Sequence, residues 1–447
     1  MNNYEQALKF IFAQIPAGDN VKFPGERGLA RMEALLDELG RPEMGYKAIH
    51  IAATSGKGST TTLATSILMA HGYKVGSTVS PHLKDIRERT QLDNTPCSKS
   101  EFVAATAEVE KSHEMVSKTS LGSPTYSEIM IAIALVVFRN AKVDFAVVET
   151  CLGGLYDTTN AMACEKVSVL GKIGLDHTHI LGDTLEKIAS QKAGIIRRPG
   201  PVVALSQTSG VNKVFSRQAN SQNAELTWID NNVVKNIKNE WGSYVYDLDL
   251  PGLKIDSIKL KSIGLHQVYN SALAVVAVQK LINNIDINVT KKALANTSIK
   301  GRFEEISLGQ ARIVIDAAHN PQKMAAFVQA LSDRYGAHSK YTFLVSFKES
   351  KDYGSMLEKI FQISDDVTFT DLADVFQDGH LRSIKFSKVP EVYVQKMKYI
   401  ANIEEAFTYA LQKAQLNNKI LVITGSMYLL GDVYSVIDKL KSIEQHE

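Results

Sequence analysis

The stretch that decides the fold runs from Ala53 to Thr60 and reads ATSGKGST. It follows an apolar run at residues 48–53, which is typical of a buried strand. It precedes residues 59–71, whose pattern predicts a helix that ends at Gly72. A strand, a glycine-containing turn and a helix N-terminus together present backbone N–H groups to an anion. The sequence therefore predicts a phosphate-binding loop.

The loop meets the pattern G-x-x-x-x-G-K-[ST] only in part. Ile51 stands where the first glycine is required, and Gly58 separates Lys57 from the first hydroxyl. An ordinary strand-to-helix turn is the plain alternative. The run of hydroxyl residues from Ser59 to Thr62 favours phosphate binding. In that interpretation Lys57 reaches the β- and γ-phosphates and a hydroxyl of this run lies near a metal ion.

The bulk composition bounds the class of protein. A chain of 447 residues predicts two domains. Its net charge of only +2, from 50 basic and 48 acidic residues, argues against nucleic acid as the main partner. The three cysteines, which include no Cys-x-x-Cys pair, indicate a reducing compartment. The first residues predict an amphipathic helix and not a signal peptide, and no apolar run has the length of a membrane span. We therefore expect a cytoplasmic protein that binds neither membrane nor nucleic acid.

Apolar strand-length runs alternate with helix-length segments, which is typical of a parallel sheet covered by helices. Strands are predicted at 48–53, 75–79, 143–148, 167–170, 311–316, 341–346 and 419–424, and helices at 59–71, 129–140, 267–282, 323–335, 353–363 and 403–415. Polar alternating residues between 206 and 261 predict hairpins added to the main sheet. A polar stretch with Gly301 predicts a hinge, so we expect domains at 1–298 and 299–447.

Three polar residues each end or follow a predicted strand on the side of the phosphate loop. Glu149 ends the run at 143–148, His177 follows the next strand and Ser80 follows a third. The carboxyl ends of parallel strands face the ligand crevice, and Mg²⁺ prefers carboxylates with other oxygen donors. The plain alternatives are a strand-end acid that caps a helix and two surface histidines. The coincidence of all three favours a metal site.

Ordered motifs along nearly the whole chain resemble the folylpolyglutamate synthase and dihydrofolate synthase family of the Mur ligase superfamily. They are TSGKGST at 54–60, SPHL at 80–83, ETCLGG at 149–154, GLDHT at 174–178, LGDTLEKI at 181–188, KAGII at 192–196, GRFE at 301–304, DAAHNP at 316–321 and TGSMYL at 424–429. The resemblance implies an α/β fold, with a P-loop parallel-sheet ATPase domain of the Mur ligase central type followed by a smaller Rossmann-like α/β domain.

The resemblance also implies a reaction. ATP phosphorylates a substrate carboxylate, and L-glutamate then attacks the acyl phosphate to form an amide. Positioning of the reactants and neutralisation of their charge lower the barrier of such a reaction. The family further implies a monomer.

The resemblance assigns roles to residues of this sequence. The ATP-binding residues are Thr54, Ser55, Gly56, Lys57, Gly58, Ser59, Thr60, His266, Gln267, Asn270, Arg302 and Asp316. The Mg²⁺ residues are Ser80, Glu149 and His177, with Lys192 as a carbamylated lysine beside the metal. The substrate-binding residues are Arg31, Thr125, Tyr126, Asp157, His319 and Ser346. Catalytic roles fall to Lys57, Lys192 and His177.

Most departures from the family pattern lie near the phosphate loop or on the face expected to hold the acceptor. The departures are Ala53, Ser55, Leu155, Ser127, Ala30 and the pair Thr150 and Cys151. Loss of an aromatic surface at Ser127 and of an arginine at Leu155 would weaken binding of a flat anionic pterin. Two alternatives therefore stand beside a folate ligase. One is a Mur-like ligase for a non-folate carboxylate, and the other is a catalytically silent nucleotide-binding scaffold. A P-loop kinase or GTPase is disfavoured, because no guanine-specificity motif is present.

Overall fold

The computed structural model describes residues 3–15, 24–336, 340–372 and 383–444. The chain divides into two compact units. Unit 1 comprises Met1–Ile237, Val245–Leu260 and His266–Thr297. Unit 2 comprises Lys238–Tyr244, Lys261–Leu265 and Ser298–Glu447.

The main elements of unit 1 alternate between strands and helices. The helices are α1 (Tyr4–Phe12), α2 (Gly25–Glu38), α3 (Lys57–Ala70), α4 (Lys99–Ser117), α5 (Tyr126–Ala141), α6 (Thr178–Leu181), α7 (Leu185–Ala193), α8 (Ser209–Ser221), α9 (His266–Ile282) and α10 (Ile287–Asn296), with the 3₁₀ turns η1 (Pro42–Gly45), η2 (Ile86–Arg89) and η3 (Thr158–Ala161). The strands are β1 (Lys47–Ala52), β2 (Val75–Thr78), β3 (Gln91–Leu92), β4 (Thr95–Pro96), β5 (Phe145–Glu149), β6 (Lys166–Leu170), β7 (Pro201–Leu205) and β8 (Glu225–Ile229).

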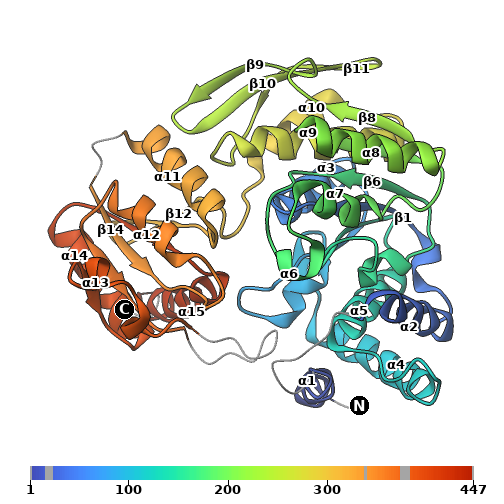
Figure 1. Ribbon diagram of the computed structural model, residues 1–447, viewed down its shortest axis with the longest axis horizontal. Helices are drawn as coiled ribbons and strands as arrows, with labels where there is room; N and C mark the ends of the chain where they lie inside the picture. The colour runs from blue at the N-terminus through green and yellow to red at the C-terminus, as the bar shows by residue number, and fades with distance from the viewer. Residues whose placement is uncertain (1–2, 16–23, 337–339, 373–382, 445–447) are drawn as a thin grey trace. The chain divides into compact units, whose positions relative to one another are not determined.

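These eight strands form one sheet in the order β4-β3-β2-β5-β1-β6-β7-β8. Strands β2, β5, β1, β6, β7 and β8 run parallel to one another. Side chains alternate along β1, so Ala48 and Ala52 share a face on which α5, α7 and α8 pack. Helices α3 and α9 pack against each other and against the sheet (Figure 1). The sheet is thus the middle of three layers, as the parallel-sheet prediction requires.

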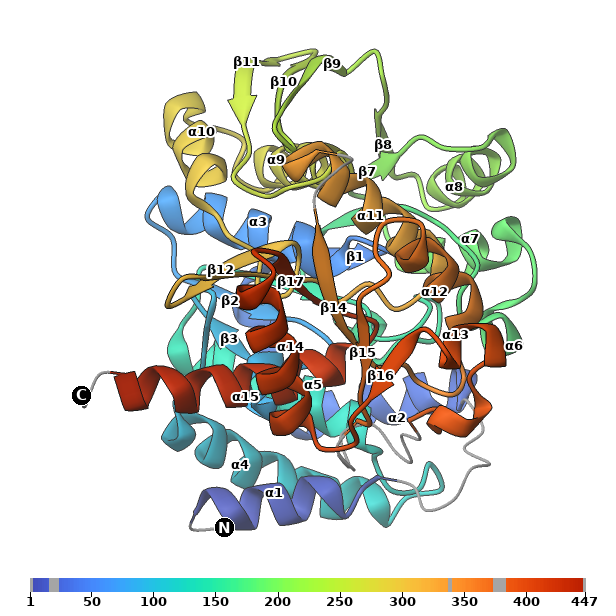
Figure 2. The same ribbon diagram turned by 90° about the vertical axis from the view of Figure 1, so that its left-hand side faces the viewer.

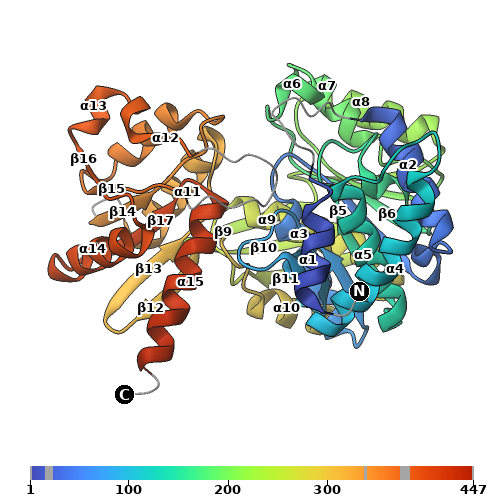
Figure 3. The ribbon, with the colours of Figure 1, turned by 90° about the horizontal axis from the view of Figure 1, so that it is seen from below.

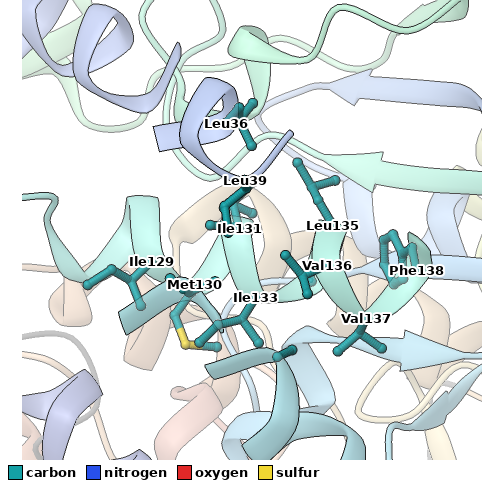
Figure 4. Packing of buried hydrophobic residues seen from close by; sticks show 14 of the residues in the cluster. Leu36, Leu39, Ile129, Met130, Ile131, Ile133, Leu135, Val136, Val137 and Phe138 are labelled. Atoms are coloured by element: carbon teal, nitrogen blue, oxygen red, sulfur yellow. The ribbon is translucent and has the colours of Figure 1, made fainter. Parts of the chain in front are cut away.

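Helix α5 is buried along almost its whole length, and most of it belongs to the largest apolar cluster of unit 1. Figure 4 shows its side chains, including Ile131 and Phe138, together with Leu36 and Leu39 at the end of α2. The ring of Phe138 lies 2.5 Å from the place that a Cβ on Gly76 would occupy. Only glycine fits at this point of β2, which fixes the spacing between α5 and the sheet.

Unit 2 contains a second sheet with the order β12-β13-β17-β14-β15-β16. Its elements are β12 (Glu304–Leu308), β13 (Ala311–Ile315), α11 (Pro321–Tyr335), β14 (Tyr341–Val345), α12 (Tyr353–Phe361), β15 (Val367–Phe369), η4 (Phe386–Lys388), α13 (Glu391–Val394), β16 (Met397–Tyr399), α14 (Ile403–Leu416), β17 (Ile420–Thr424) and α15 (Met427–Glu444). Strand β12 is antiparallel to β13, and the other five strands are parallel (Figure 2). Helices α11 and α12 share an apolar cluster with these strands, and α12 and α14 lie on opposite sides of them (Figure 3).

The predicted α/β class is confirmed, and the predicted strands and helices are present with shifted ends. The prediction for residues 206–261 was partly wrong. Residues 209–221 form helix α8, and β8 completes the main sheet. The hairpin strands β9 (Val234–Glu240), β10 (Ser243–Leu250) and β11 (Leu253–Lys259) form a separate three-stranded sheet. Within the described residues no helix is long and apolar enough to cross a bilayer.

Candidate active site

The phosphate loop lies between β1 and α3, as the sequence predicts. Gly56 is the N-cap of α3 with a φ of 90°, a conformation that glycine adopts without strain. Backbone N–H groups of Thr54 and Ser55 donate to Lys172 O at 2.8 and 3.4 Å, which ties the loop to the end of β6. Lys57 Nζ donates to Ala53 O at 3.2 Å, so the ammonium curls back over the loop. The first turn of α3 holds no acidic residue, which leaves the positive end of its dipole for an anion.

The first turn of α9 packs against this loop. Asn270 Oδ1 occupies the place that a Cβ on Gly56 would take. Asn270 Nδ2 donates to Gln267 Oε1 at 3.0 Å, and Gln267 Nε2 lies 3.5 Å from Ser59 Oγ. All three side chains are buried. Of the residues His266, Gln267 and Asn270, which the resemblance assigns to ATP, the structure locates Gln267 and Asn270 at the phosphate loop itself.

Glu149 lies beside the phosphate loop at the carboxyl end of β5. Its Oε1 accepts hydrogen bonds from the backbone N–H of Ser80 and, at 3.1 Å, from Ser80 Oγ. Its Oε2 lies 3.5 Å from the place that a Cβ on Gly58 would occupy. The structure therefore brings together two of the three predicted metal ligands and the loop.

His177, the third predicted ligand, is the N-cap residue of the short helix α6 and has a positive φ of 50°. Its side chain is 48% exposed, and its Nε2 lies 3.9 Å from Asp176 Oδ1. Among the residues that the structure describes, no three His, Cys, Asp or Glu side chains gather as a metal site. Oxygen donors other than carboxylates, such as the Ser80 hydroxyl, lie outside that set.

The loop that follows Glu149 is held against α7, the helix that carries Lys192. Leu155 N donates to Gln191 O at 2.7 Å. A Cβ on Gly154 would stand 2.7 Å from the carbonyl oxygens of Gln191 and Lys192, so only glycine allows this approach. Lys192 is only 4% exposed. The predicted lysine thus lies in the interior of unit 1.

Predicted acceptor-side residues lie around the start of α5. Thr125 is the N-cap of α5, and Glu128 completes its capping box. Arg31 is buried and forms two 2.8 Å hydrogen bonds with Glu128. Tyr126 is buried beneath Arg89, whose guanidinium lies 5.6 Å from the ring centroid.

Sequence reasoning gave no role to Arg89 or to His82. Arg89 Nε donates to His82 Nδ1 at 2.8 Å, and the Arg89 guanidinium lies over the ring of Tyr126. Their signal in the sequence is the motif SPHL at 80–83 together with the arginine at position 89.

In unit 2, the predicted residues Asp316 and His319 lie in the segment between β13 and α11. Asp316 accepts hydrogen bonds from the backbone N–H groups of Phe303 and Ala318, both at 2.8 Å. Burial raises the pKa of Asp316, while the charge of Arg302 opposes this rise. Ser346 follows β14, and its buried hydroxyl has no hydrogen-bond partner among the described residues. A buried hydroxyl without a protein partner is available to a ligand or to water.

His319 is partly buried next to this point and makes two contacts. Its Nδ1 lies 2.8 Å from Ala317 O, and its Nε2 lies 3.0 Å from Lys323 Nζ. Burial lowers the pKa of His319 well below its usual value, and the charges of Lys323, Arg302 and Lys351 lower it further. The histidine is therefore neutral and surrounded by cations, which suits an anionic ligand.

Known proteins resemble this chain over most of its length. Residues 51–278 match the family model of the Mur ligase middle domain, and residues 299–436 match that of the dihydrofolate synthetase C-terminal domain. The chain is 31% identical over 364 residues to dihydrofolate synthase/folylpolyglutamate synthase of Mycobacterium tuberculosis, covering 76% of this chain and 74% of the relative. It is 29% identical over 444 residues to the protein of the same name from Bacillus subtilis, covering 96% and 98%.

This chain belongs to the folylpolyglutamate and dihydrofolate synthase family of Mur ligases. The structure of Mycobacterium tuberculosis folylpolyglutamate synthase complexed with ADP superposes with a TM-score of 0.85 at 28% identity, covering 97% of this chain and 98% of that one. The predicted family, two-domain fold and enzyme class, an ATP-dependent ligase, are thereby confirmed. The roles given to single residues and to Mg²⁺ stay predictions.

Proposed function

We propose that this member of the folylpolyglutamate and dihydrofolate synthase family adds L-glutamate to the carboxylate of a folate-type acceptor at the expense of ATP. The observation that carries this proposal is the position of Glu149 beside the phosphate loop, with Ser80 bound to the same carboxylate. A phosphate cradle with an adjacent metal-binding acid is the machinery of phosphoryl transfer. The names of the relatives support folate metabolism as its context.

The proposed reaction has two steps. A carboxylate oxygen of the acceptor attacks the γ-phosphorus, the bond to the β-phosphate oxygen breaks and ADP leaves. The glutamate amine then attacks the carbonyl carbon of the acyl phosphate, loses a proton and expels phosphate, which leaves an amide. Lys57 and the N-terminus of α3 bind the phosphates of ATP, a role supported by their place in the loop.

The donor set near Glu149 fits Mg²⁺. A buried carboxylate with an adjacent hydroxyl, at the end of parallel strands and beside a phosphate loop, supplies the oxygen ligands that this ion prefers. Ser80, Glu149 and His177 would hold it, and Lys192 would join them as a carbamate, since a bare ammonium would repel the metal. A bound Mg²⁺ supplies charge neutralisation for the phosphates.

We assign the acceptor to residues 1–298 and glutamate to residues 299–447. Thr125, Tyr126, Asp157 and Arg31 would contribute to acceptor binding, with Arg31 acting through Glu128, to which it is bound. The residues assigned to glutamate are His319 and Ser346. The residues assigned to ATP outside the phosphate loop are His266, Gln267, Asn270, Arg302 and Asp316. The free thiols support a cytoplasmic location, and we further propose a monomer.

One observation keeps a non-folate acceptor as the second candidate. Leu155 packs against Gly194, because a Cβ on Gly194 would stand 2.5 Å from Leu155 Cβ. An aliphatic side chain thus lies where the family pattern has an arginine, and one cation for an anionic acceptor is lost.

The experiment is an acceptor panel. Purified protein would receive Mg²⁺, ATP and labelled L-glutamate with tetrahydrofolate, dihydropteroate or non-folate acids, and products would be resolved by mass. We expect label on tetrahydrofolate, dihydropteroate or both. Label only on a non-folate acid would overturn the folate assignment and leave the ligase. Release of no phosphate with any acceptor would favour a silent scaffold.

A further inference from the structure

A series of hydrogen bonds runs through unit 1 from β6 to the loop that follows Glu149. Lys166 Nζ lies 3.1 Å from His50 Nδ1, and His50 Nε2 lies 2.8 Å from Thr159 Oγ1. The Thr159 hydroxyl donates to Asp157 Oδ1 at 2.5 Å. His50 and Thr159 are fully buried, and Asp157 is 3% exposed. The proposed reaction gives no role to Lys166, His50 or Thr159.

The chemistry of the groups fixes the direction of this series. Below the pKa of about 8 that burial gives Lys166, its side chain is an ammonium that only donates, so His50 Nδ1 accepts and the proton of the neutral ring sits on Nε2. Burial lowers the pKa of His50 well below its usual value, and the charge of Lys166 lowers it further, so the ring is neutral. Nε2–H then donates to Thr159 Oγ1, whose own proton goes to Asp157. Every donor thus points from Lys166 towards the carboxylate.

Sheet register places the first two members. His50 on β1 is the parallel partner of Ser168 on β6. Lys166 stands two residues before Ser168, so its side chain leaves the sheet on the same face as His50. The turn η3, which contains Thr159, contacts α2 and α5, and these helices cover that face. The series is therefore built from rigid elements, which favours a precise end point.

The end point is a carboxylate that organises the loop from Glu149 to Asp157. Asp157 Oδ2 accepts from Leu152 N at 2.6 Å, and its Oδ1 also accepts from Thr159 N at 3.0 Å. Burial raises the pKa of Asp157, while these hydrogen bonds and the charge of Lys57 oppose the rise. The carboxylate therefore lies within electrostatic reach of the phosphate-binding lysine. A small rotation of Asp157 would move the loop and any substrate bound to it.

We infer that Lys166, His50 and Thr159 are positioning residues that orient Asp157, and through it the loop at 149–157, for binding the acceptor. The inference rests on the proposed function, because Asp157 is assigned to the acceptor there. Asp157 would touch the substrate, whereas the other three act only through it. The specific consequence is an effect on the acceptor and not on ATP or glutamate.

The matched pair of variants is Thr159→Val and Thr159→Ser. Valine keeps the shape of threonine and removes the hydroxyl, whereas serine keeps the hydroxyl. Thr159→Val should raise the KM for tetrahydrofolate about tenfold, the scale of one hydrogen bond to a charged group, with little change in the KM for ATP. Thr159→Ser should restore a near-normal KM. Thr158→Val is the control, because the buried Thr158 hydroxyl next in sequence makes no hydrogen bond among the described residues.

A KM for tetrahydrofolate equal to that of the wild type, or equal rises for all three substrates, would overturn the inference while leaving the ligase intact. Failure of the wild-type protein to ligate glutamate to any folate would instead overturn the proposed function, and with it the acceptor role of Asp157.

A second measurement needs no substrate, so it tests the series of hydrogen bonds separately from the proposed function. Proton–nitrogen NMR of protein labelled at histidine should show His50 as the neutral Nε2–H tautomer. Lys166→Met, which removes the donor to Nδ1, should shift the His50 nitrogen resonances, and Lys187→Met on the surface should not. A charged or Nδ1–H ring in the wild type would overturn the series of hydrogen bonds, even if ligation is normal.

Discussion

Lys57 is the side chain on which the phosphate loop depends most. It begins α3 and already turns back to Ala53 O at 3.2 Å, so its charge is positioned before a ligand arrives. Lys57→Ala should therefore lower kcat at least about a hundredfold, the scale of removing one preorganised electrostatic group. The rate of phosphate release in the presence of ATP, Mg²⁺, glutamate and acceptor measures kcat. Lys47→Ala, which removes a lysine of an exposed ion pair, is the control and should change little. Near-normal turnover of Lys57→Ala would contradict the phosphate-loop assignment.

Lys166 predicts a pH dependence of stability. Burial lowers its pKa from 10.5 to about 8. Between these values the unfolded chain binds more protons than the folded one, so this group makes the free energy of unfolding rise with pH. The free energy of unfolding of the wild type minus that of Lys166→Met should therefore increase from pH 8 to pH 10. Urea unfolding at a series of pH values measures it, and a difference that is flat or falls would refute the prediction.

The turn between β1 and α3 tolerates only glycine at position 56, for two reasons. Gly56 has a φ of +90°, and Asn270 fills the place of its Cβ. Gly72 at the end of α3 is a matched control, because its φ is +87° and nothing lies within 4 Å of its Cβ position. Gly72→Ala should cost about 1–2 kcal/mol of the free energy of unfolding. Gly56→Ala should cost about 1–3 kcal/mol more through overpacking and should weaken ADP binding.

Urea unfolding of both variants separates the cost of the strained backbone from the cost of overpacking, and ADP titration measures nucleotide binding. Equal losses of stability in Gly56→Ala and Gly72→Ala would show that Asn270 yields to the added methyl group, and the close packing of α9 on the loop would then be wrong.

Helices α2 and α5 are joined by the buried pair of Arg31 and Glu128. The side chains are 9% and 0% exposed, and the contact is bidentate at 2.8 Å. Arg31→Met leaves a buried carboxylate without its cation, so the free energy of unfolding should fall by about 3–5 kcal/mol. The half-exposed pair of Arg139 and Glu108 is the comparison, and Arg139→Met should cost only about 1 kcal/mol. Similar losses in both variants, measured by urea unfolding, would contradict this reading of the buried pair.

Local pattern sufficed to predict elements whose signal lies within one segment. The phosphate loop, Glu149 at the end of β5 and the central parallel strands follow from apolar runs and their punctuation. Contacts between distant segments were beyond that reasoning. His50 looked like one more strand residue, because Thr159 and Lys166 lie 109 and 116 residues away. The separate sheet of β9, β10 and β11 was missed for the same reason, since alternation indicates a hairpin but not its neighbour.

Across the whole molecule, three thiols report on the integrity of the fold. Burial raises the pKa of Cys97 and Cys151 to about 12 and that of Cys164 to about 11. At pH 8 hardly any thiolate is present in the native state, and the thiolate is the reactive form. A disulfide reagent should therefore react slowly with the native protein and at once with three thiols in urea. Rapid reaction of native Cys97 or Cys164, which are both buried, would show that this part of the fold opens.

The packing of α9 on the phosphate loop has a consequence for synthesis on the ribosome. Gln267 and Ser59 lie 208 residues apart in the sequence, so the side chain that packs against the loop is synthesised long after the loop itself. At about 5–20 residues per second, roughly 10–40 s pass between the two. During that time β1 and α3 exist without the side chains that fill the space beside Gly56. A nascent chain should therefore acquire affinity for nucleotide late in its synthesis, only once α9 has emerged from the ribosome.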